Sequence, residues 1–251
     1  RIEMYIKTVL KHILESPYKE TLYAIDVLNE YFHSWGKSDS PDTGKGVAFF
    51  EDIYPIREAT GQSMVTNPEF AKKAYMICYE MLEQYNMTEK TKLFYNDFST
   101  YNGDIADRII KFHNYLNSKD SINPEGKKIC EGVGMQTHLG YNNPTLALYE
   151  ETVNKFVDAG LKIHVTEWDV MHNRQNGIAT PEECGKYYKD IMSILVNANA
   201  GKPEPVVTSI TIWGLYDGVS WRAEWNPLIF TGLYNPKPAY YDLMDLVKPT
   251  N

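Results

Sequence analysis

The sequence predicts an α/β protein built around a parallel β-sheet, and two features carry that prediction. Short apolar runs bounded by polar residues, Gly or Pro recur along the chain, as expected for buried strands. Between them lie longer segments whose apolar residues follow the 3.6-residue period of a helix. Strands that alternate with helices form parallel sheets, because each helix carries the chain back to the start of the next strand.

Five of the apolar runs are predicted to be strands, because each is short and ends in polar or turn-forming residues. They are Leu22–Leu28, Lys92–Asn96, Gly132–Gln136, Leu161–Glu167 and Val207–Trp213. No internal repeat or low-complexity stretch interrupts them.

The segments between the strands carry helix signals. "RIEMYIKTVLKHILESPY" is amphipathic with charges throughout, which predicts a helix and not a signal peptide. Asn67-Pro68-Glu69 supplies a cap, a first-turn proline and an acidic first turn. The predicted helices cover residues 1–18, 67–85, about 105–116, 143–160, 181–196 and from Pro238 onward. The longest irregular stretch is Tyr31–Thr66, and a loop of that length is usually functional or disordered.

Composition narrows the class of protein. A chain of 251 residues with a formal charge of -8 argues against nucleic acid or an anionic membrane as partner. No run of 18 apolar residues exists to span a bilayer. Cys78, Cys130 and Cys184 lack metal-ligand spacing and are expected to be buried thiols. The 19 Tyr, 9 Phe and 5 Trp fit either core packing or a sugar-binding cleft.

Two of the predicted strands end in glutamate, "AIDVLNE" in Glu30 and "KIHVTEWD" in Glu167. Active sites of α/β proteins lie at the carboxyl ends of parallel strands. Two carboxylates placed there can act as the pair that glycoside hydrolysis needs, one as acid and one as nucleophile or base. Either Glu alone would be better explained as a solvated residue at a strand end. Their shared position after buried strands favours a functional pair, since charge there is costly without a purpose.

A third strand, "GVGMQTHLG", ends with Gln136 and His138, which share a side because they lie two residues apart. By the same alternation Glu167 and Asp169 share a side, and a histidine beside a carboxylate can tune its pKa and hold its orientation. Four other histidines are expected to be structural: His164 in the core, and His33, His113 and His172 on the surface.

The fifth strand continues into "TIWGLYDGVSW", which supplies Trp213 and Trp221. These rings are either core residues or the walls of a sugar subsite, and the sequence does not distinguish the two.

Six ordered segments resemble family 10 glycoside hydrolases, the endo-β-1,4-xylanases. They are "IDVLNE", "LFYNDF", "GVGMQTHL", "IHVTEWD", "TIWGLYDGVSWR" and "PLIFTGLYNPKPAYYDLM", with family-like spacing over residues 22 to 244.

The resemblance implies a (β/α)8 TIM barrel and a retaining, double-displacement mechanism. Glu30 matches the general acid/base after the fourth strand, and Glu167 the nucleophile after the seventh. Asn29 matches the amide that hydrogen-bonds the sugar 2-hydroxyl. The other matching positions are His138 hydrogen-bonded to the nucleophile, Asp169 behind it, Gln136 as an amide on the same strand, Asn96 at the end of the fifth strand, and Trp213 and Trp221 lining the reacting and neighbouring subsites.

Three positions depart from the family's usual pattern. Phe98 stands where Tyr is common after Asn-Asp, so a hydroxyl contact to an acceptor-side sugar is lost. Trp168 follows the nucleophile where Leu is more usual, and its indole N–H needs a partner if buried. Trp35, in the long loop, is either an acceptor-side stacking platform or packed on its own neighbours.

Five strands cannot close an eight-stranded barrel, so the barrel encoded here is expected to be incomplete. By the resemblance the chain holds strands 4–8 and their helices, strands 1–3 are absent, and residues 1–251 form the C-terminal portion of a single catalytic barrel. A carbohydrate-binding module inserted near the third strand, as in some family members, or truncation would account for this. We expect exposed sheet edges, and activity only with the N-terminal segment of the same catalytic domain.

The resemblance implies xylan and xylo-oligosaccharides as substrates, with no metal or organic cofactor, no nucleic acid and no membrane insertion. The alternatives are a related retaining β-1,4-glucanase and a non-catalytic carbohydrate-binding barrel, although the presence of both glutamates argues against the latter. Because the substrate is a polymer too large to enter a cell, we expect a secreted, periplasmic or cell-surface location.

Overall fold

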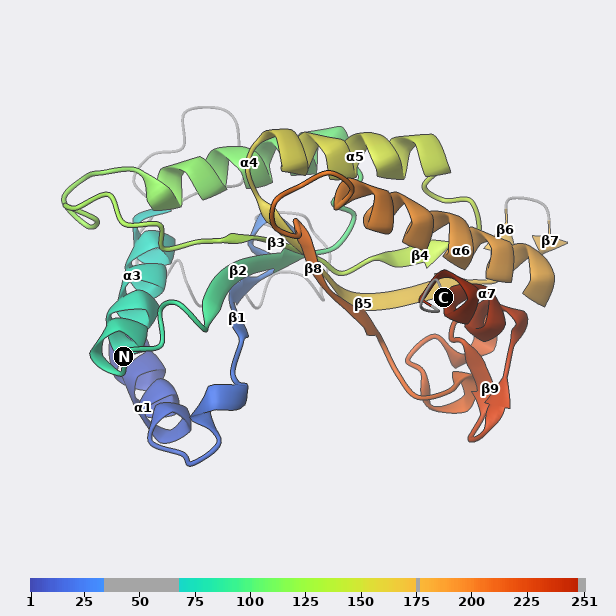
Figure 1. Ribbon diagram of the computed structural model, residues 1–251, viewed down its shortest axis with the longest axis horizontal. Helices are drawn as coiled ribbons and strands as arrows, with labels where there is room; N and C mark the ends of the chain where they lie inside the picture. Colours follow the sequence, from blue (N-terminus) through green and yellow to red (C-terminus); the bar gives the residue numbers. More distant parts are fainter. Residues whose placement is uncertain (34–67, 175–176, 248–251) are drawn as a thin grey trace, which may run out of the picture. The chain divides into compact units, whose positions relative to one another are not determined.

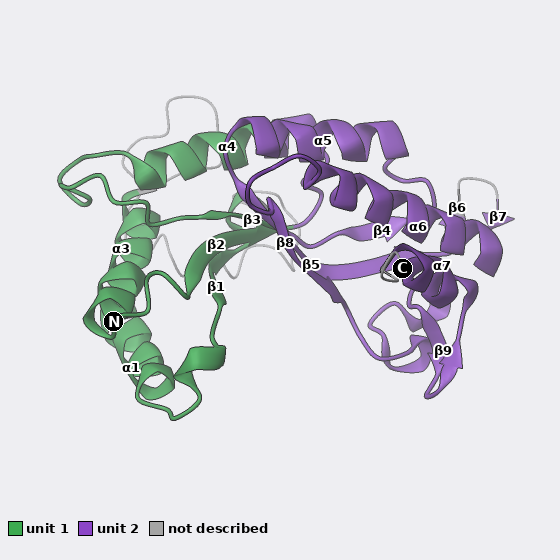
Figure 2. Cartoon of the chain, viewed as in Figure 1, with its two compact units in different colours: residues 1–97, 107–134 green, residues 98–106, 135–251 purple. Residues whose placement is uncertain are grey.

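The computed structural model describes residues 1–33, 68–174 and 177–247 (Figure 1). Strands and helices alternate along the chain, which confirms the α/β class with parallel strand pairs. The chain forms two compact units, unit 1 with residues 1–97 and 107–134 and unit 2 with residues 98–106 and 135–251 (Figure 2).

Unit 1 is built on three neighbouring strands with helices beside them. The strands, in sheet order, are β1 (Ala24–Asn29), β2 (Lys92–Asp97) and β3 (Gly132–Met135). The helices are α1 (Ile2–Leu14), α3 (Pro68–Gln84) and α4 (Gly103–Asn117), with short 3-10 turns η1 (Lys19–Thr21) and η2 (Tyr31–His33). β1 and β2 run parallel, with Asn29 opposite Asn96, and α3 packs against α1 and both strands.

An aromatic cluster fills the core of unit 1 beside the end of β1. Tyr31 and Phe32 of η2 pack on Phe112 of α4, at ring-centroid distances of 5.4 and 5.5 Å. Phe32 also meets Tyr95 of β2 edge-on, and its backbone N–H donates to the Tyr95 hydroxyl at 3.1 Å. Burial of these rings holds the backbone that directly follows residue 30.

Unit 2 is built on β5 (Lys162–Met171), which lies between two parallel partners. β4 (His138–Gly140) pairs with the second half of β5, and β8 (Val207–Ile212) pairs along its other side. The helices of this unit are α5 (Leu146–Asp158), α6 (Pro181–Ala198) and α7 (Pro238–Val247). Two short antiparallel pairs, β6–β7 (Asn173–Arg174, Gly177–Ile178) and β9–β10 (Phe230–Gly232, Asn235–Pro236), and the 3-10 turns η3 (Asp217–Val219) and η4 (Ala223–Trp225) complete it.

All five predicted strands are present, with two corrections near the candidate site. The third strand ends at Met135, and Thr137 adopts a left-handed conformation with φ 61°, so His138 begins a separate strand. Gln136 and His138 therefore do not lie on one continuous strand as predicted. Glu167 does not end its strand either, because pairing with β4 continues β5 to Met171.

The predicted helices are also present, with one shifted start. α5 begins at Leu146 and not at Asn143, because Asn143 is held in a turn by two backbone hydrogen bonds with Gly140. The Thr145 side chain caps the helix by accepting from the Leu148 N–H. At α6 the predicted signals are confirmed, since Pro181 opens the helix after a reciprocal Thr180–Glu183 capping box.

Burial corrects two histidine predictions and confirms others. His113 and His172 are buried, not on the surface, because α4 and the end of β5 pack those positions inward. His164 is buried in β5 and the three cysteines are buried thiols, as predicted. The side chain of His33 and the residues of the long loop after it, Trp35 included, lie outside the described residues.

The outermost strand of each unit is less buried than its neighbours. In the described part of the chain, β1 pairs only with β2, and β8 pairs only with β5. Their residues are mostly half-buried, whereas β2 and β3 are almost completely buried. The expectation of exposed sheet edges therefore agrees with the burial of both strands.

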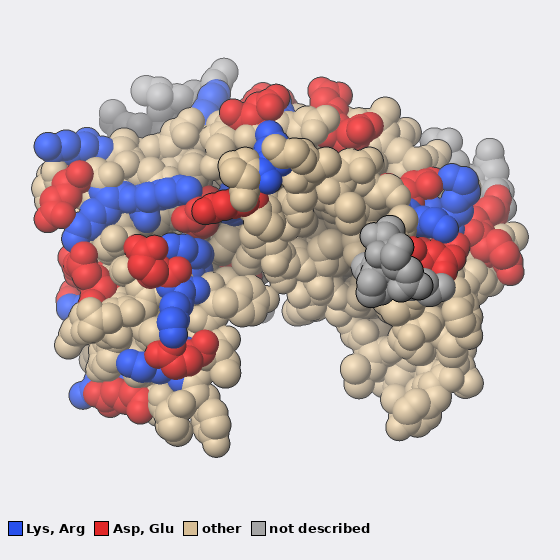
Figure 3. All heavy atoms as spheres, in the orientation of Figure 1, with Lys and Arg blue, Asp and Glu red and all other residues tan. Residues whose placement is uncertain are grey.

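The surface shown in Figure 3 carries charges of both signs, which interleave over α1 and α3. Several are paired, for example Lys7 with Glu3 at 2.6 Å and Lys127 with Glu83 at 2.8 Å. Among the described helices, none is both long and apolar enough to cross a membrane.

Candidate active site

His138 of β4 joins two carboxylates of β5. Its Nε2 lies 3.2 Å from Glu167 Oε2, and its Nδ1 lies 3.0 Å from Asp169 Oδ2. The predicted shared side of Glu167 and Asp169 is thus confirmed by one ring that contacts both. Backbone bonds fix the arrangement, since the Glu167 N–H donates to the Gln136 carbonyl at 3.0 Å and the Asp169 N–H donates to that of Thr137 at 3.3 Å.

A β-bulge sets the direction of the Glu167 side chain. Val165 lies opposite Ile210 and Trp168 opposite Ile212, so two residues of β5 face a single residue of β8 between those pairs. Such bulges bend a strand and re-aim side chains beside active sites. Glu167 is one of the two bulged residues, and its side chain stays partly exposed while its neighbour Trp168 is buried.

Asp169 is fully buried and accepts from three side-chain donors. Its Oδ2 accepts from His138 and from Trp221 Nε1 at 2.9 Å, and its Oδ1 accepts from an Arg222 guanidinium N–H at 3.1 Å. A buried carboxylate is costly unless it is paired and hydrogen-bonded. The three donors meet that requirement and fix the plane of the carboxylate.

The two carboxylates also favour the charged form of His138. Burial of the imidazole opposes protonation, but the hydrogen bonds to Asp169 and Glu167 outweigh it, so the pKa of His138 lies above its ordinary value. An imidazolium can donate to both carboxylates at once, whereas a neutral ring can donate to only one. The charged ring can thereby direct an N–H donor at Glu167 while it also donates to Asp169.

The indole rings of Trp213 and Trp221 are surface features, not core residues. They are 45% and 62% exposed, with their centroids 6.5 and 5.0 Å from that of His138. The Trp213 backbone N–H donates to the Trp168 carbonyl at 3.0 Å, which ties the segment after β8 to the bulge. Of the two readings left open by the sequence, exposure favours rings that can stack on a ligand.

A buried ion pair holds the segment that carries Trp221. Lys237 Nζ lies 3.1 Å from Asp217 Oδ2 and donates to the Asn226 carbonyl at 2.6 Å. Asp217 Oδ1 accepts from the Leu228 N–H at 2.8 Å. Burial lowers the pKa of Lys237, and Asp217 partly restores it. These contacts pin residues 217–228 against each other and support Trp221.

The predicted site residues Asn29, Glu30 and Asn96 belong to unit 1. Glu30 directly follows β1 and has a left-handed backbone with φ 58°, which is uncommon for a non-glycine residue. Its N–H donates to the Asn96 carbonyl at 2.9 Å, and the Asn96 amide donates to Asn29 Oδ1 at 2.8 Å. The unusual conformation is therefore stabilised by β2, as is common for residues held at functional sites.

Trp168 departs from its prediction. Its ring is completely buried and lies 4.7 Å from that of Tyr188, so it has the expected pocket behind the strand. Its Nε1, however, has no hydrogen-bond partner within the described residues.

Two other predicted positions are also described. Gln136 is buried, and its backbone carbonyl accepts from the Glu167 N–H. Phe98 is half-buried.

Sequence reasoning did not assign Arg222, Asp217 or Lys237. Each lies in a segment quoted for its resemblance, but the neighbours of a charged residue in the sequence give no sign of its partner. Only the distances to Asp169 and within the Asp217–Lys237 pair reveal their roles.

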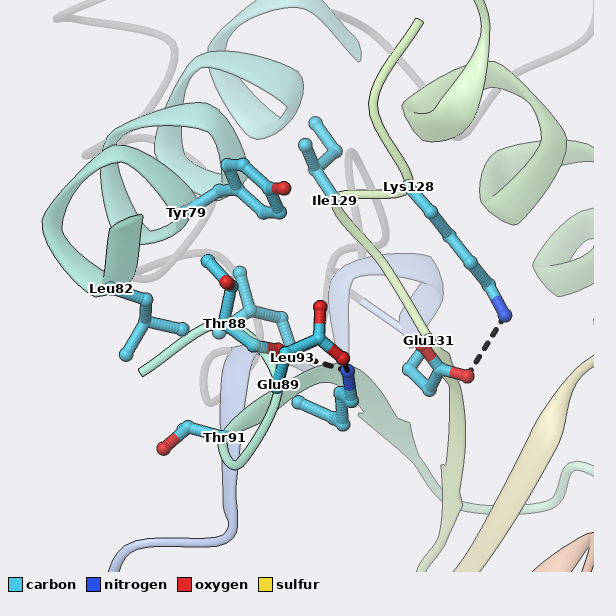
Figure 4. Close-up of a pocket in the computed structure, with 10 residues that line it drawn as sticks. Tyr79, Leu82, Thr88, Glu89, Thr91, Leu93, Lys128, Ile129 and Glu131 are labelled. Atoms are coloured by element: carbon cyan, nitrogen blue, oxygen red, sulfur yellow. Dashed lines mark hydrogen bonds and ion pairs between the residues drawn. The ribbon is translucent and has the colours of Figure 1, made fainter. Parts of the chain in front are cut away.

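Unit 1 contains a cavity of about 170 Å³ (Figure 4). It is lined by Tyr79 and Leu82 of α3 and by Lys92 and Glu131 at the amino ends of β2 and β3. In parallel α/β proteins the chemistry occurs at the carboxyl ends of the strands, so this cavity is not the expected place for an active site.

Within residues 1–33, 68–174 and 177–247, no group of three or more His, Cys, Asp or Glu side chains could hold a metal ion.

Comparison with known proteins identifies relatives along almost the whole chain. The family model described as glycosyl hydrolase family 10 matches residues 1–246. Endo-1,4-beta-xylanase A of Butyrivibrio fibrisolvens is 33% identical over 244 residues, which cover 97% of this chain and 51% of that protein. The bifunctional endo-1,4-beta-xylanase XylA of Ruminococcus flavefaciens is 30% identical over 99% of this chain and 22% of its own length. The chain thus spans about half, or less, of these relatives.

Solved structures agree in fold. The CBM22-1–GH10 modules of xylanase 10B from Clostridium thermocellum, complexed with xylohexaose, match with a TM-score of 0.73 at 24% identity, over 98% of this chain and 45% of that one. Xylanase Xyn10A of Cellvibrio japonicus matches with a TM-score of 0.70 at 24% identity, over 97% and 69%.

Proposed function

This chain belongs to glycosyl hydrolase family 10, and from that premise we propose that it forms part of a retaining endo-β-1,4-xylanase. Glu167 is the proposed nucleophile and Glu30 the proposed acid/base. The observation that carries the proposal is the 3.2 Å contact of Glu167 with a histidine that is itself held by buried Asp169. Support for the substrate class comes from relatives named as xylanases.

The proposed reaction has two displacements. The Glu167 carboxylate attacks the anomeric carbon while Glu30 donates its proton to the departing glycosidic oxygen, which leaves a glycosyl ester on Glu167. Glu30, now ionised, takes a proton from water, and the water oxygen displaces Glu167 with overall retention. A retaining mechanism needs about 5 to 5.5 Å between the two carboxyl groups, and this spacing is part of the proposal.

The side chains around Glu167 suit the first displacement. His138 contacts the carboxylate at 3.2 Å, which holds it oriented until it attacks. Exposed Trp213 and Trp221 offer apolar ring faces to the C–H face of a xylose unit. We propose that Asn29 bonds the sugar 2-hydroxyl, with Asn96 orienting its amide at 2.8 Å.

We further propose that additional strands from the same catalytic domain close the barrel and complete the cleft. The half-buried outer strands β1 and β8, each with a single partner strand in the described part of the chain, support this. Xylan hydrolysis by a polypeptide of only these 251 residues, at the rate of the full-length protein, would contradict it.

We also propose that the protein is secreted, periplasmic or on the cell surface, because its proposed substrate is a polymer too large to enter a cell. Cell fractionation tests this location.

The decisive experiment compares Glu167→Gln, Glu30→Gln and a control, Glu89→Gln, in the full-length protein. Glu89 is 96% exposed, so its variant should keep wild-type turnover. Both site variants should lose several orders of magnitude in turnover on xylan and keep their thermal stability. On an aryl β-xyloside with an activated leaving group, azide should rescue Glu30→Gln to a β-xylosyl azide, because that leaving group departs without an acid, the glycosyl ester forms, and azide needs no base.

Three results would overturn the proposal. An initially inverted product, seen in the anomeric NMR signals, would exclude double displacement. Faster release of reducing sugar from β-1,4-glucan than from xylan would favour the glucanase alternative. Binding of xylan by the wild-type protein without turnover would favour a non-catalytic barrel.

A further inference from the structure

Arg222 contacts two of the site residues through different parts of its guanidinium. One N–H donates to Asp169 Oδ1 at 3.1 Å, and the guanidinium carbon lies 4.2 Å from the ring centroid of Trp221. The Trp221 indole N–H donates to the other oxygen of the same carboxylate at 2.9 Å. Arg222, Trp221 and Asp169 therefore close a three-membered set of contacts.

Each contact in this set restrains the others. Arg222 is only partly exposed, with 18% of its side chain accessible, and the carboxylate it meets is completely buried. The cation lies over one face of an exposed indole, so that face is covered and the ring has one preferred tilt. Trp221 still exposes 62% of its surface, which leaves part of the residue accessible to a ligand.

The same carboxylate holds His138, so the effect of Arg222 extends to Glu167. His138 Nδ1 shares Asp169 Oδ2 with the Trp221 indole, and His138 Nε2 contacts Glu167. Removing Arg222 would leave Asp169 Oδ1 buried without that donor, and the carboxylate would be free to rotate. Rotation would change both hydrogen bonds at Oδ2.

We propose that Arg222 is a positioning residue: it fixes the Trp221 ring and the Asp169 carboxylate together, and through Asp169 it orients His138 toward Glu167. The catalytic meaning of this role rests on the proposed xylanase function, but the geometry does not.

Charge gives the proposal a measurable sign. Within the described residues the imidazole is influenced by Glu167 and Asp169 from β5 and by Arg222 from the segment after β8. Burial and the Arg222 cation disfavour the imidazolium, whereas the two carboxylates favour it and prevail. Loss of the cation should therefore raise the pKa of His138 further. Loss of the cation would move this titration even if Arg222 positioned nothing, so the Trp221 indole signal and KM are the readouts that report positioning.

The test uses the full-length protein with labelled histidine and tryptophan. In Arg222→Met the NMR titration of His138 should move upward, because the cation that opposes the imidazolium is lost, and the Trp221 indole N–H signal should shift. Arg222→Lys keeps the charge but loses the planar fork, so the titration should stay near wild type while the indole signal still shifts. Lys186→Met, an exposed cation of the same unit paired with Asp190, is the matched control and should change neither.

Kinetics on xylo-oligosaccharides supply the second readout. Arg222→Met should raise KM roughly 3- to 10-fold, because the Trp221 ring is no longer held in place. Arg222→Lys should raise KM by less, but not restore the wild-type value. If Arg222→Met fails to fold, the test rests on Arg222→Lys. A wild-type Trp221 indole signal and a wild-type KM in Arg222→Lys would then overturn the proposal. Wild-type His138 titration and Trp221 signal in a folded Arg222→Met would overturn it as well. An inactive wild-type protein would refute the proposed function, whereas the NMR result would still decide the role of Arg222.

Discussion

Two buried histidines should make unit 2 sensitive to mild acid. His164 lies inside β5 and His172 directly follows it, with side chains that expose only 6% and 4% of their surface. Burial lowers the pKa of His164 from 6.5 to about 4, and burial together with the Lys237 cation lowers that of His172 to about 4. Both rings are therefore neutral in the folded protein at pH values where the unfolded chain protonates them.

The sign and size of the effect follow from linkage. Because the folded-state pKa is depressed, each histidine contributes its full stability above about pH 6.5 and loses it as the pH falls toward 4. The difference between the unfolded pKa of 6.5 and the folded pKa of about 4 limits the contribution of each histidine to the free energy of unfolding to about 3 kcal/mol. About 2 kcal/mol of that contribution is lost by pH 5. His138, whose pKa is raised, has the opposite sign and does not contribute to acid lability.

The perturbation is His164→Gln, which cannot protonate in this range, and the assay is urea unfolding at pH 7.5 and pH 5. The fall in unfolding free energy between the two pH values should be about 2 kcal/mol smaller in the variant than in wild type. The absolute stability of the variant does not enter the comparison. His12→Gln on α1, where the side chain is exposed, is the control and should leave the fall unchanged. Equal falls in wild type and His164→Gln would refute the reasoning.

Other predictions concern stability, each measured by denaturant unfolding. Lys72, fully buried, donates to the Ser118 carbonyl and to Asp120 at 2.7 Å. Lys72→Met should therefore cost about 1 to 3 kcal/mol, because buried acceptors lose their donor; a loss below 1 kcal/mol would show that water replaces it. Thr180→Ala removes half of the capping box of α6 and should cost about 1 kcal/mol, whereas Thr180→Ser should cost far less. Gly214 has φ 140°, and an added Cβ would lie 2.8 Å from a Leu228 methyl, so Gly214→Ala should destabilise by more than 1 kcal/mol; a neutral result would contradict the close approach.

Local sequence signals located the elements well because they depend on neighbouring residues. The Thr180-Pro181 start of α6 and the apolar run of β2 lie where periodicity and capping place them. The failures occur where backbone conformation or pairing intervenes. Thr137 turns left-handed and splits a predicted strand, and the partner β4 extends β5 beyond Glu167. No local pattern specifies either event.

Burial was harder to predict for polar residues than for apolar ones. His113 and His172 occupy positions that read as surface, yet α4 and the end of β5 bury them. Trp168 is buried as expected, but its indole N–H does not meet the hydrogen-bond partner it was predicted to need within the described residues. Composition cannot settle such cases, because the environment of a side chain is set by elements distant in the chain.

The sequence by itself determined the order of strands and helices, the family, and the residue types at the candidate site, Glu30, Glu167 and His138 among them. Tertiary structure alone decided which of these groups meet. Asp169 gathers His138 from 31 positions earlier and Arg222 from 53 positions later. Such contacts depend on strand pairing and on the fold of the segment after β8. Residues so far apart in the sequence form hydrogen bonds only when the folded sheet has brought donor and acceptor atoms within about 3 Å of each other.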